Sequence, residues 1–282
     1  MAVNEAQKDF WSGGGGKVWV EQQVQLDQMI GPMGDLALAK LPLSGGENVL
    51  DIGCGAGTTS LELVARVGAS GHVHGADISE PLTAYAKERA AAAGLDNLTF
   101  SLTDMQVDQP PHAPFDAVFS RFGVMFFEDA YAGFNNIHAA MKPGAPLAFV
   151  CWQAQTENPW TLVAAQAIMP YVELPAPLPP KAPGPFAFQE QAYVADILAQ
   201  SGFKDVEIEG ETRLMTMFDG VPLEEAVARY FNINPTIKAL INAAEGVDEA
   251  EIVAAVTEAF KPYHQDGKLQ FQGAVWVVTA RA

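Results

Sequence analysis

Hydrophobic and polar positions along the chain switch between two spacings, and the switches predict where strands give way to helices. Residues 47–53 form a short β-rich run that ends in glycine, and residues 58–68 follow with Leu61, Val64 and Ala65 at helical spacing. Comparable apolar runs predict strands at 72–77, 98–102, 115–120 and 146–152, with helices after Ser79 and Asp129. Parallel neighbours need crossover connections, so this alternation predicts a doubly wound, mostly parallel α/β sheet with helices on both faces.

The pattern changes after Trp152. A helical stretch near 160–171 leads into seven prolines between Pro170 and Pro185, which predict a stiff crossing loop over 170–188. The pattern beyond it predicts, in order, a helix at 189–200, a strand at 206–217, a mainly helical insertion at 223–262 and a last strand at 274–280.

The N-terminal part of the chain precedes the first predicted strand. Residues 17–41 have apolar positions at roughly helical intervals, whereas the run Gly13–Gly16 is expected to be flexible. The predicted organisation has three parts: a helical lid segment at 1–44, an α/β core at 45–218 and 268–282, and a helical cap at 219–267.

Composition and charge limit the partners. Apolar residues make up 49% of the chain and charged residues 18%, which is typical of a folded protein rather than a disordered one. The net charge of −18 repels phosphate backbones, and the sequence contains no run of basic residues. The group that comes closest to such a run, Lys87 and Arg89, is expected on the surface face of a helix. Nucleic acid is therefore not an expected partner.

Localisation follows from what the sequence does not contain. It has no run of 18 apolar residues, and its polar N-terminus lacks the apolar centre of a signal peptide, so we expect a cytoplasmic protein without integral membrane association. Two cysteines cannot form a disulfide framework, and the five histidines lack the spacing of metal ligands. We expect a monomer or a homodimer, and no metal.

A glycine loop follows the first predicted strand. Gly53, Gly55 and Gly57 come directly after Asp51, where glycine lets backbone approach a ligand closely. A dinucleotide-binding loop would place its third glycine at Thr58, and Asp51 would repel a pyrophosphate. Both features argue against a nicotinamide-dependent dehydrogenase, and Asp51 suits a ligand that carries an ammonium group.

Two further acidic residues end the next predicted strands. Asp77 can accept hydrogen bonds from both hydroxyls of a ribose, and Asp104 can accept one from an adenine amine, with Met105 against the ring. Each could instead be a helix cap or a solvated turn residue. Ligands of open α/β sheets bind outside the carboxyl ends of the strands, which is where all three acids are expected.

These residues resemble the class I S-adenosylmethionine-dependent methyltransferases. The run Asp51–Gly57 is similar to their first motif, Asp77 to their acidic residue at the end of the second strand, Asp104 with Met105 to their adenine-side motif, and Lys142-Pro143-Gly144 to the turn before their fifth strand. The resemblance covers about 47–152 and is strongest to the branch of ubiquinone and menaquinone biosynthesis and of small-molecule methyltransferases. It implies a Rossmann-like sheet of seven strands with helical lid insertions.

The resemblance also implies a cofactor, S-adenosylmethionine (SAM), and a product, S-adenosylhomocysteine. The cofactor-binding residues expected are Asp51, Gly53, Cys54, Gly55, Asp77, Ile78, Asp104, Met105, Ser120 and Trp19. The sulfonium already activates the methyl group, so the protein mainly has to align an acceptor and exclude water. A helical insertion replaces the tight hairpin usual between the last two strands, which leaves the acceptor open.

Aromatic residues concentrate in segments expected to cover the strand ends, and such apolar surroundings suit an apolar or aromatic acceptor. The expected pocket residues are Trp11, Phe122, Met125, Trp152, Phe186 and Tyr230. The one candidate for a general base is His264, for which a solvated histidine near a loop is the favoured alternative. The sequence thus predicts methyl transfer to O, N or C of a small molecule; a noncatalytic SAM- or nucleotide-binding partner protein is the alternative.

Overall fold

A computed structural model describes residues 4–244, 246 and 248–282. Five parallel strands form most of a central sheet: β1 (Asn48–Ile52), β2 (His72–Asp77), β3 (Leu98–Leu102), β4 (Ala117–Arg121) and β5 (Pro146–Trp152). Two long strands complete it, β6 (Lys204–Asp219) and β8 (Lys268–Arg281), and a two-residue β7 (His264–Gln265) pairs with β8. The order is β3-β2-β1-β4-β5-β8-β6, with β8 antiparallel to both of its neighbours, which confirms the expected fold class.

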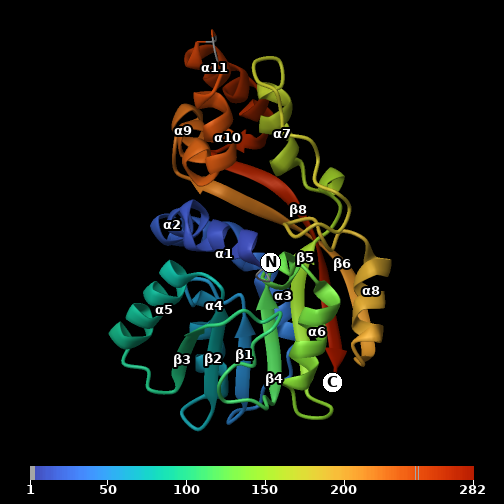
Figure 1. The fold of residues 1–282 in the computed structure, drawn as a ribbon. Helices are drawn as coiled ribbons and strands as arrows, with labels where there is room; N and C mark the ends of the chain where they lie inside the picture. Colours follow the sequence, from blue (N-terminus) through green and yellow to red (C-terminus); the bar gives the residue numbers. More distant parts are fainter. Residues whose placement is uncertain (1–3, 245, 247) are drawn as a thin grey trace.

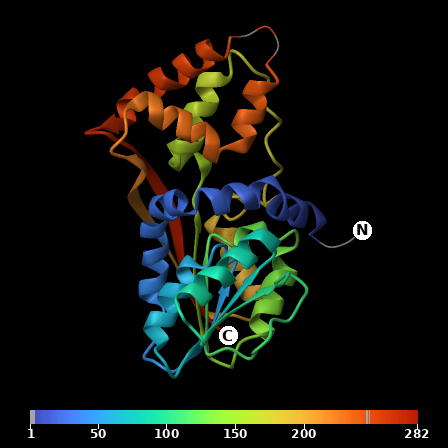
Figure 2. The ribbon, with the colours of Figure 1, turned by 90° about the vertical axis from the view of Figure 1, so that its left-hand side faces the viewer.

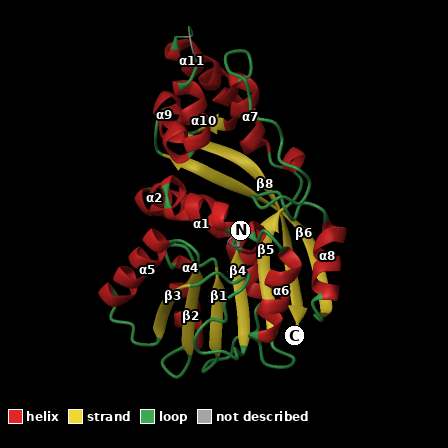
Figure 3. Cartoon of the chain, in the orientation of Figure 1, coloured by secondary structure: helices red, strands yellow, loops and turns green. Residues whose placement is uncertain are grey.

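Helices cover both faces of this sheet (Figures 1 and 3). On one face lie α3 (Gln23–Lys40) and α4 (Thr58–Val67), and on the other lie α6 (Ala130–Ala139) and α8 (Gln191–Gln200), while α5 (Glu80–Ala92) packs on β2 and β3. Ser79 caps α5 as expected, because its side chain accepts a hydrogen bond from Leu82 N. The helix expected after Asp129 is α6, and the Asp129 side chain caps it by accepting from Ala132 N.

The strands β6 and β8 continue well beyond the rest of the sheet. Their far ends carry a helical cap built from α7 (Pro159–Ile168), α9 (Leu223–Ile233), α10 (Pro235–Asn242) and α11 (Glu249–Phe260) (Figure 1). Three short 3-10 turns lie at 124–126, 155–157 and 261–263. β8 begins six residues earlier than expected, since Leu269 and Phe271 are buried against the cap while β6 pairs with this stretch.

The N-terminal residues form two helices that the sequence did not predict as such, α1 (Glu5–Ser12) and α2 (Gly14–Glu21). The expectation that Gly13–Gly16 is flexible is wrong. Gly16 is helical and buried, and a Cβ there would lie 2.8 Å from Ser79 Oγ, so glycine permits close packing on α5. Both views place α1 and α2 between the strand ends and the cap (Figures 1 and 2).

None of the described helices combines the length and the apolar character that a bilayer crossing requires. Cys54 and Cys151 are both buried free thiols.

Candidate functional site

The glycine loop lies at the carboxyl end of β1, at the centre of the sheet. Gly53, Gly55 and Gly57 all have positive φ, of 65°, 53° and 80°, which only glycine adopts without strain. Gly53 also packs on the turn after β4, because a Cβ at Gly53 would lie 2.6 Å from Gly123 Cα. Ser120 supports the same contact, since its hydroxyl donates to Ile52 O (2.8 Å) and accepts from Gly123 N (3.2 Å).

Asp77 lies beside this loop at the end of β2. Its carboxylate accepts a hydrogen bond from Gly55 N and another from Ser79 N, each 2.8 Å long. Burial raises the pKa of Asp77, and hydrogen bonds from the backbone of Ser79, Gly55 and Ile78 oppose that rise. Asp77 therefore stabilises the glycine loop and also places a carboxylate at the carboxyl ends of the parallel strands.

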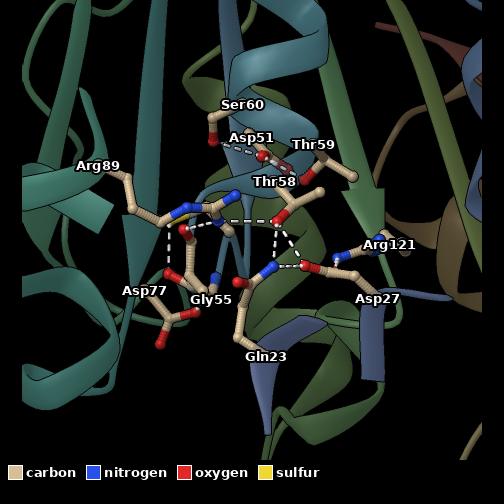
Figure 4. A network of polar contacts seen from close by, with 12 residues as sticks. Gln23, Asp27, Asp51, Gly55, Thr58, Thr59, Ser60, Asp77, Arg89 and Arg121 are labelled. Carbon is tan, nitrogen blue, oxygen red and sulfur yellow. Dashed lines mark hydrogen bonds and ion pairs between the residues drawn. The ribbon is translucent and has the colours of Figure 1, made fainter. Parts of the chain in front are cut away.

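Asp51 is the most deeply buried acid of the site. Its Oδ2 accepts hydrogen bonds from Thr59 Oγ1 (2.7 Å) and Ser60 Oγ (2.6 Å) at the start of α4 (Figure 4). Its Oδ1 has no hydrogen-bond partner among the described residues. Burial raises the pKa of Asp51 to about 6, although the two hydroxyls and Arg121 oppose the rise. An unpartnered buried carboxylate oxygen is a natural acceptor for a ligand cation or a bound water.

Asp104 lies in the turn after β3 and is also buried. Its Oδ1 accepts from Asn4 Nδ2 (2.9 Å) and from Gln106 N (3.1 Å), and its Oδ2 forms an ion pair of 3.1 Å with Lys8. The first turns of α1 thus contact the carboxylate that the sequence assigns to adenine. Met105 is buried next to it, while Ile78 is half-buried beside Asp77.

Aromatic side chains form two groups around these acids. In the first, the Trp11 ring meets Phe10, Trp19 and Phe126 edge-on, with centroids 5.1, 6.0 and 5.1 Å away. In the second, Phe122 and Trp152 stack at 4.4 Å above the ends of β4 and β5, and Trp160 lies 5.1 Å from Trp152.

Several expected pocket residues lie near these groups, and others do not. Met125 is buried in the turn after β4, and its carbonyl accepts a hydrogen bond from Gly184 N (3.1 Å). This bond fixes the proline-rich loop, including its half-buried Phe186, to the turn after β4. Tyr230 lies instead inside the cap, where its ring meets Phe260 at 5.0 Å. It therefore packs with other cap residues rather than with Phe122 and Trp152.

His264 also lies in the cap. Its Nε2 is 3.0 Å from Val221 O, and it pairs with Leu269, six residues along β8 from Val275, the partner of Trp152. Six strand residues span about 20 Å, so His264 is far from the end of β5. A base at that distance could not reach an acceptor bound beside the glycine loop.

Three polar residues that contact the site were not predicted from the sequence. Arg89, expected on a surface face, instead donates from α5 to Ala56 O and, over 2.8 Å, to Thr58 Oγ1 (Figure 4). Asp27 of α3 forms an ion pair with Arg121 at the end of β4. The sequence signal for Arg121 is a single charged residue at the end of a buried strand, which by itself does not identify a partner.

No group of three or more His, Cys, Asp or Glu side chains in the described part of the chain is arranged to hold a metal ion. Three histidines, His72, His74 and His112, lie together, but the contacts of His74 are hydrogen bonds within the fold. Both ring nitrogens of buried His74 have hydroxyl partners, Thr99 at 2.9 Å and Ser101 at 2.8 Å, and the ring of His112 lies 5.3 Å away. Burial, together with the nearby His112, His72 and Lys87, lowers the pKa of His74 to about 4.

This pKa predicts an acid-sensitive contribution to stability. His74 binds a proton near pH 6.5 in the unfolded chain but only near pH 4 in the folded protein. The free energy of unfolding therefore falls as the pH drops from about 6.5 to about 4. Asp51 acts in the opposite direction, since its folded carboxyl gains a proton near pH 6. We expect wild type to lose about 2 kcal/mol more than His74→Asn between pH 7 and 4.5 in urea unfolding. Parallel pH profiles of the two proteins would contradict the assignment.

Comparison with known proteins adds the decisive observation. Residues 49–144 match a family described as a methyltransferase domain. Over this stretch the chain is similar to methyltransferase domains. Its matched residues run from the start of β1 to the turn before β5 and include Asp51, the glycine loop, Asp77 and Asp104.

Relatives in sequence extend beyond this domain. The chain is 28% identical over 251 residues to an uncharacterized protein, Rv1405c, of Mycobacterium tuberculosis (strain ATCC 25618 / H37Rv), covering 87% of this chain and 86% of that one. It is 34% identical over 104 residues to the aklanonic acid methyltransferase DauC of Streptomyces sp. (strain C5), covering 37% of this chain and 47% of that one.

Solved structures of methyltransferases share the fold of this chain. Phosphoethanolamine N-methyltransferase 2 of Haemonchus contortus, in complex with S-adenosyl-L-methionine, superposes with a TM-score of 0.58 at 17% identity, covering all of this chain and 60% of that one. A SAM-dependent methyltransferase from Aquifex aeolicus gives 0.50 at 22% identity, covering 71% of this chain and 91% of that one. At these identities the likeness establishes the fold.

Proposed function

We propose that the chain is a methyltransferase that uses SAM as its cofactor and methylates a small, largely apolar or aromatic molecule. The observation that carries the proposal is the set of three buried acids, Asp51, Asp77 and Asp104, around a glycine loop in the matched domain. Each acid suits one part of the cofactor: the ammonium, the ribose hydroxyls and the adenine amine.

The residues fit the cofactor on chemical grounds. Asp51 Oδ1 offers an acceptor with no hydrogen-bond partner among the described residues, which an ammonium group of the cofactor would supply. Gly55 has no heavy atom of the described residues within 4 Å of the position of a Cβ, so backbone there can approach a ligand. Asp77 is held by two backbone donors and needs no movement to accept hydroxyl groups.

The bound cofactor supplies an activated methyl group, and transfer to an acceptor atom yields S-adenosylhomocysteine. The chain's own residues align the acceptor and exclude water. Buried Phe122 and Trp152 provide apolar side chains at the ends of β4 and β5, and Trp11 of α1 packs against Phe126 beside them. These side chains favour an aromatic or hydrophobic acceptor over a strongly charged one.

Incubation of the protein with SAM carrying a labelled methyl group tests the transfer step. Panels of phenols, aromatic carboxylic acids, amines and quinones should give at least one labelled product together with S-adenosylhomocysteine. SAM binding without label transfer to any panel member would favour a noncatalytic binding protein instead.

The raised pKa of Asp51 predicts how cofactor affinity depends on pH. If the ammonium pairs with Asp51, binding requires the carboxylate, so SAM affinity should rise from pH 5 until it levels off above about pH 6. The expected change is about tenfold per pH unit on the acid side, measured by titration calorimetry. Asp51→Asn should bind more weakly at pH 7 and lose this dependence; a variant that keeps the wild-type slope would exclude Asp51 as its source.

A further inference from the structure

A polar network joins helix α3 to both sides of the glycine loop (Figure 4). Asp27 lies at its centre. One carboxylate oxygen forms an ion pair with Arg121 Nη2, and the other accepts a hydrogen bond from Thr58 Oγ1; both distances are 2.5 Å. Side-chain exposure is 15% for Asp27 and 10% for Arg121, so the pair is largely shielded from water.

Thr58 is the residue at which the network meets the loop. It is the first residue of α4 and follows Gly57 directly. Its hydroxyl donates to Asp27 and accepts from Arg89 Nη1 (2.8 Å) and Gln23 Nε2 (3.3 Å), and Arg89 also donates to Ala56 O inside the loop. The end of the loop is therefore held from α3 on one side and from α5 on the other.

Arg121 is the residue at which the network meets the sheet. It ends β4, two residues before Gly123, on which Gly53 packs. Its aliphatic stem lies against α3, since a Cβ at Gly34 would be 2.6 Å from Arg121 Cδ. One carboxylate on α3 thus reaches both the end of the loop and the strand whose turn supports its start.

Buried ion pairs are often no more stable than apolar replacements, although the loss of one partner leaves an uncompensated charge. Stability alone is therefore a poor reason to place Asp27 and Arg121 here. Their position at the loop favours a role in its geometry.

We propose that Asp27 is a positioning residue of the cofactor site, which couples the docking of α3 to the conformation of the glycine loop through Thr58 and Arg121. The identity of the ligand, SAM, rests on the proposed function, whereas the coupling of α3 to the glycine loop does not depend on it. A merely structural role would change stability and cofactor affinity together, whereas a positioning role separates them.

Calorimetric titration of SAM into four proteins tests this separation: wild type, Asp27→Asn, the neutral pair Asp27→Asn/Arg121→Gln, and Asp35→Asn. The last makes the same chemical change at an exposed position of α3. We expect Asp27→Asn to melt lower and bind SAM about tenfold more weakly. The neutral pair should regain the wild-type melting temperature but not the affinity, and Asp35→Asn should match wild type in both. Wild-type affinity in Asp27→Asn, or recovery of both properties in the neutral pair, would overturn the proposal.

Amide hydrogen exchange of the same proteins without ligand tests the coupling independently of SAM. Exchange over residues 53–58 should be about tenfold faster in the neutral pair than in wild type, with exchange in β5 unchanged. Wild-type exchange in the loop would exclude the coupling. If wild type fails to bind SAM while the loop responds as expected, the proposed function fails and the coupling stands.

Discussion

Asp77→Ala is expected to weaken SAM binding at least about 100-fold, which is the largest change in affinity for a single side chain in this site. In the proposed complex the carboxylate accepts from ribose hydroxyls, and bonds to a charged acceptor contribute about 1.5–3 kcal/mol each. The substitution also leaves the donors Gly55 N and Ser79 N without their partner, which loosens the loop. Titration calorimetry measures the change directly.

Two further substitutions separate these effects. Asp77→Asn keeps one acceptor oxygen and should bind more tightly than Asp77→Ala but more weakly than wild type. Asp96→Ala removes an exposed acid just before the start of β3, at the amino ends of the parallel strands and so away from the glycine loop. It should leave SAM affinity unchanged. A folded Asp77→Ala protein with wild-type affinity would remove Asp77 from the cofactor site.

Gly53→Ala is expected to cost about 3 kcal/mol in the free energy of unfolding. The new methyl group would lie 2.6 Å from Gly123 Cα, a backbone atom that cannot turn aside, and φ of 65° adds strain for any residue with a Cβ. Urea unfolding of the two proteins, at a pH where both fold, gives the difference.

Gly55→Ala is the matched control for this substitution. Its φ of 53° carries a similar strain of about 1 kcal/mol, but no heavy atom of the described residues lies within 4 Å of the added Cβ. The methyl group points instead into the space proposed for the cofactor, so Gly55→Ala should lose SAM affinity more than stability. Equal destabilisation by both substitutions would argue against the tight contact between Gly53 and Gly123.

Sequence reasoning predicted the part of the fold in which local patterns and the sheet agree. The strands β1, β2, β3 and β5, the cap Ser79 and the helix after Asp129 lie where periodicity and turn residues placed them. The alternation of Leu269, Phe271 and Gly273 would also have predicted the early start of β8, because every second residue there faces the interior.

The remaining features depend on contacts between distant segments. Gly13–Gly16 has a composition typical of flexible chain, and only packing of Gly16 against Ser79 and Trp11 explains why it is helical. Arg89 lies on a polar stretch of α5, and nothing local shows that its guanidinium reaches Ala56. The pairing of Asp27 with Arg121 joins residues 94 positions apart, which periodicity cannot predict.

The cofactor is the central claim, and calorimetric titration of SAM, S-adenosylhomocysteine and NADH into the wild-type protein tests it most directly. The three acids around the glycine loop predict micromolar binding of the first two and none of NADH, since Asp51 and Thr58 disfavour a pyrophosphate. Binding of NADH, or a folded protein that binds neither SAM nor S-adenosylhomocysteine, would contradict the account.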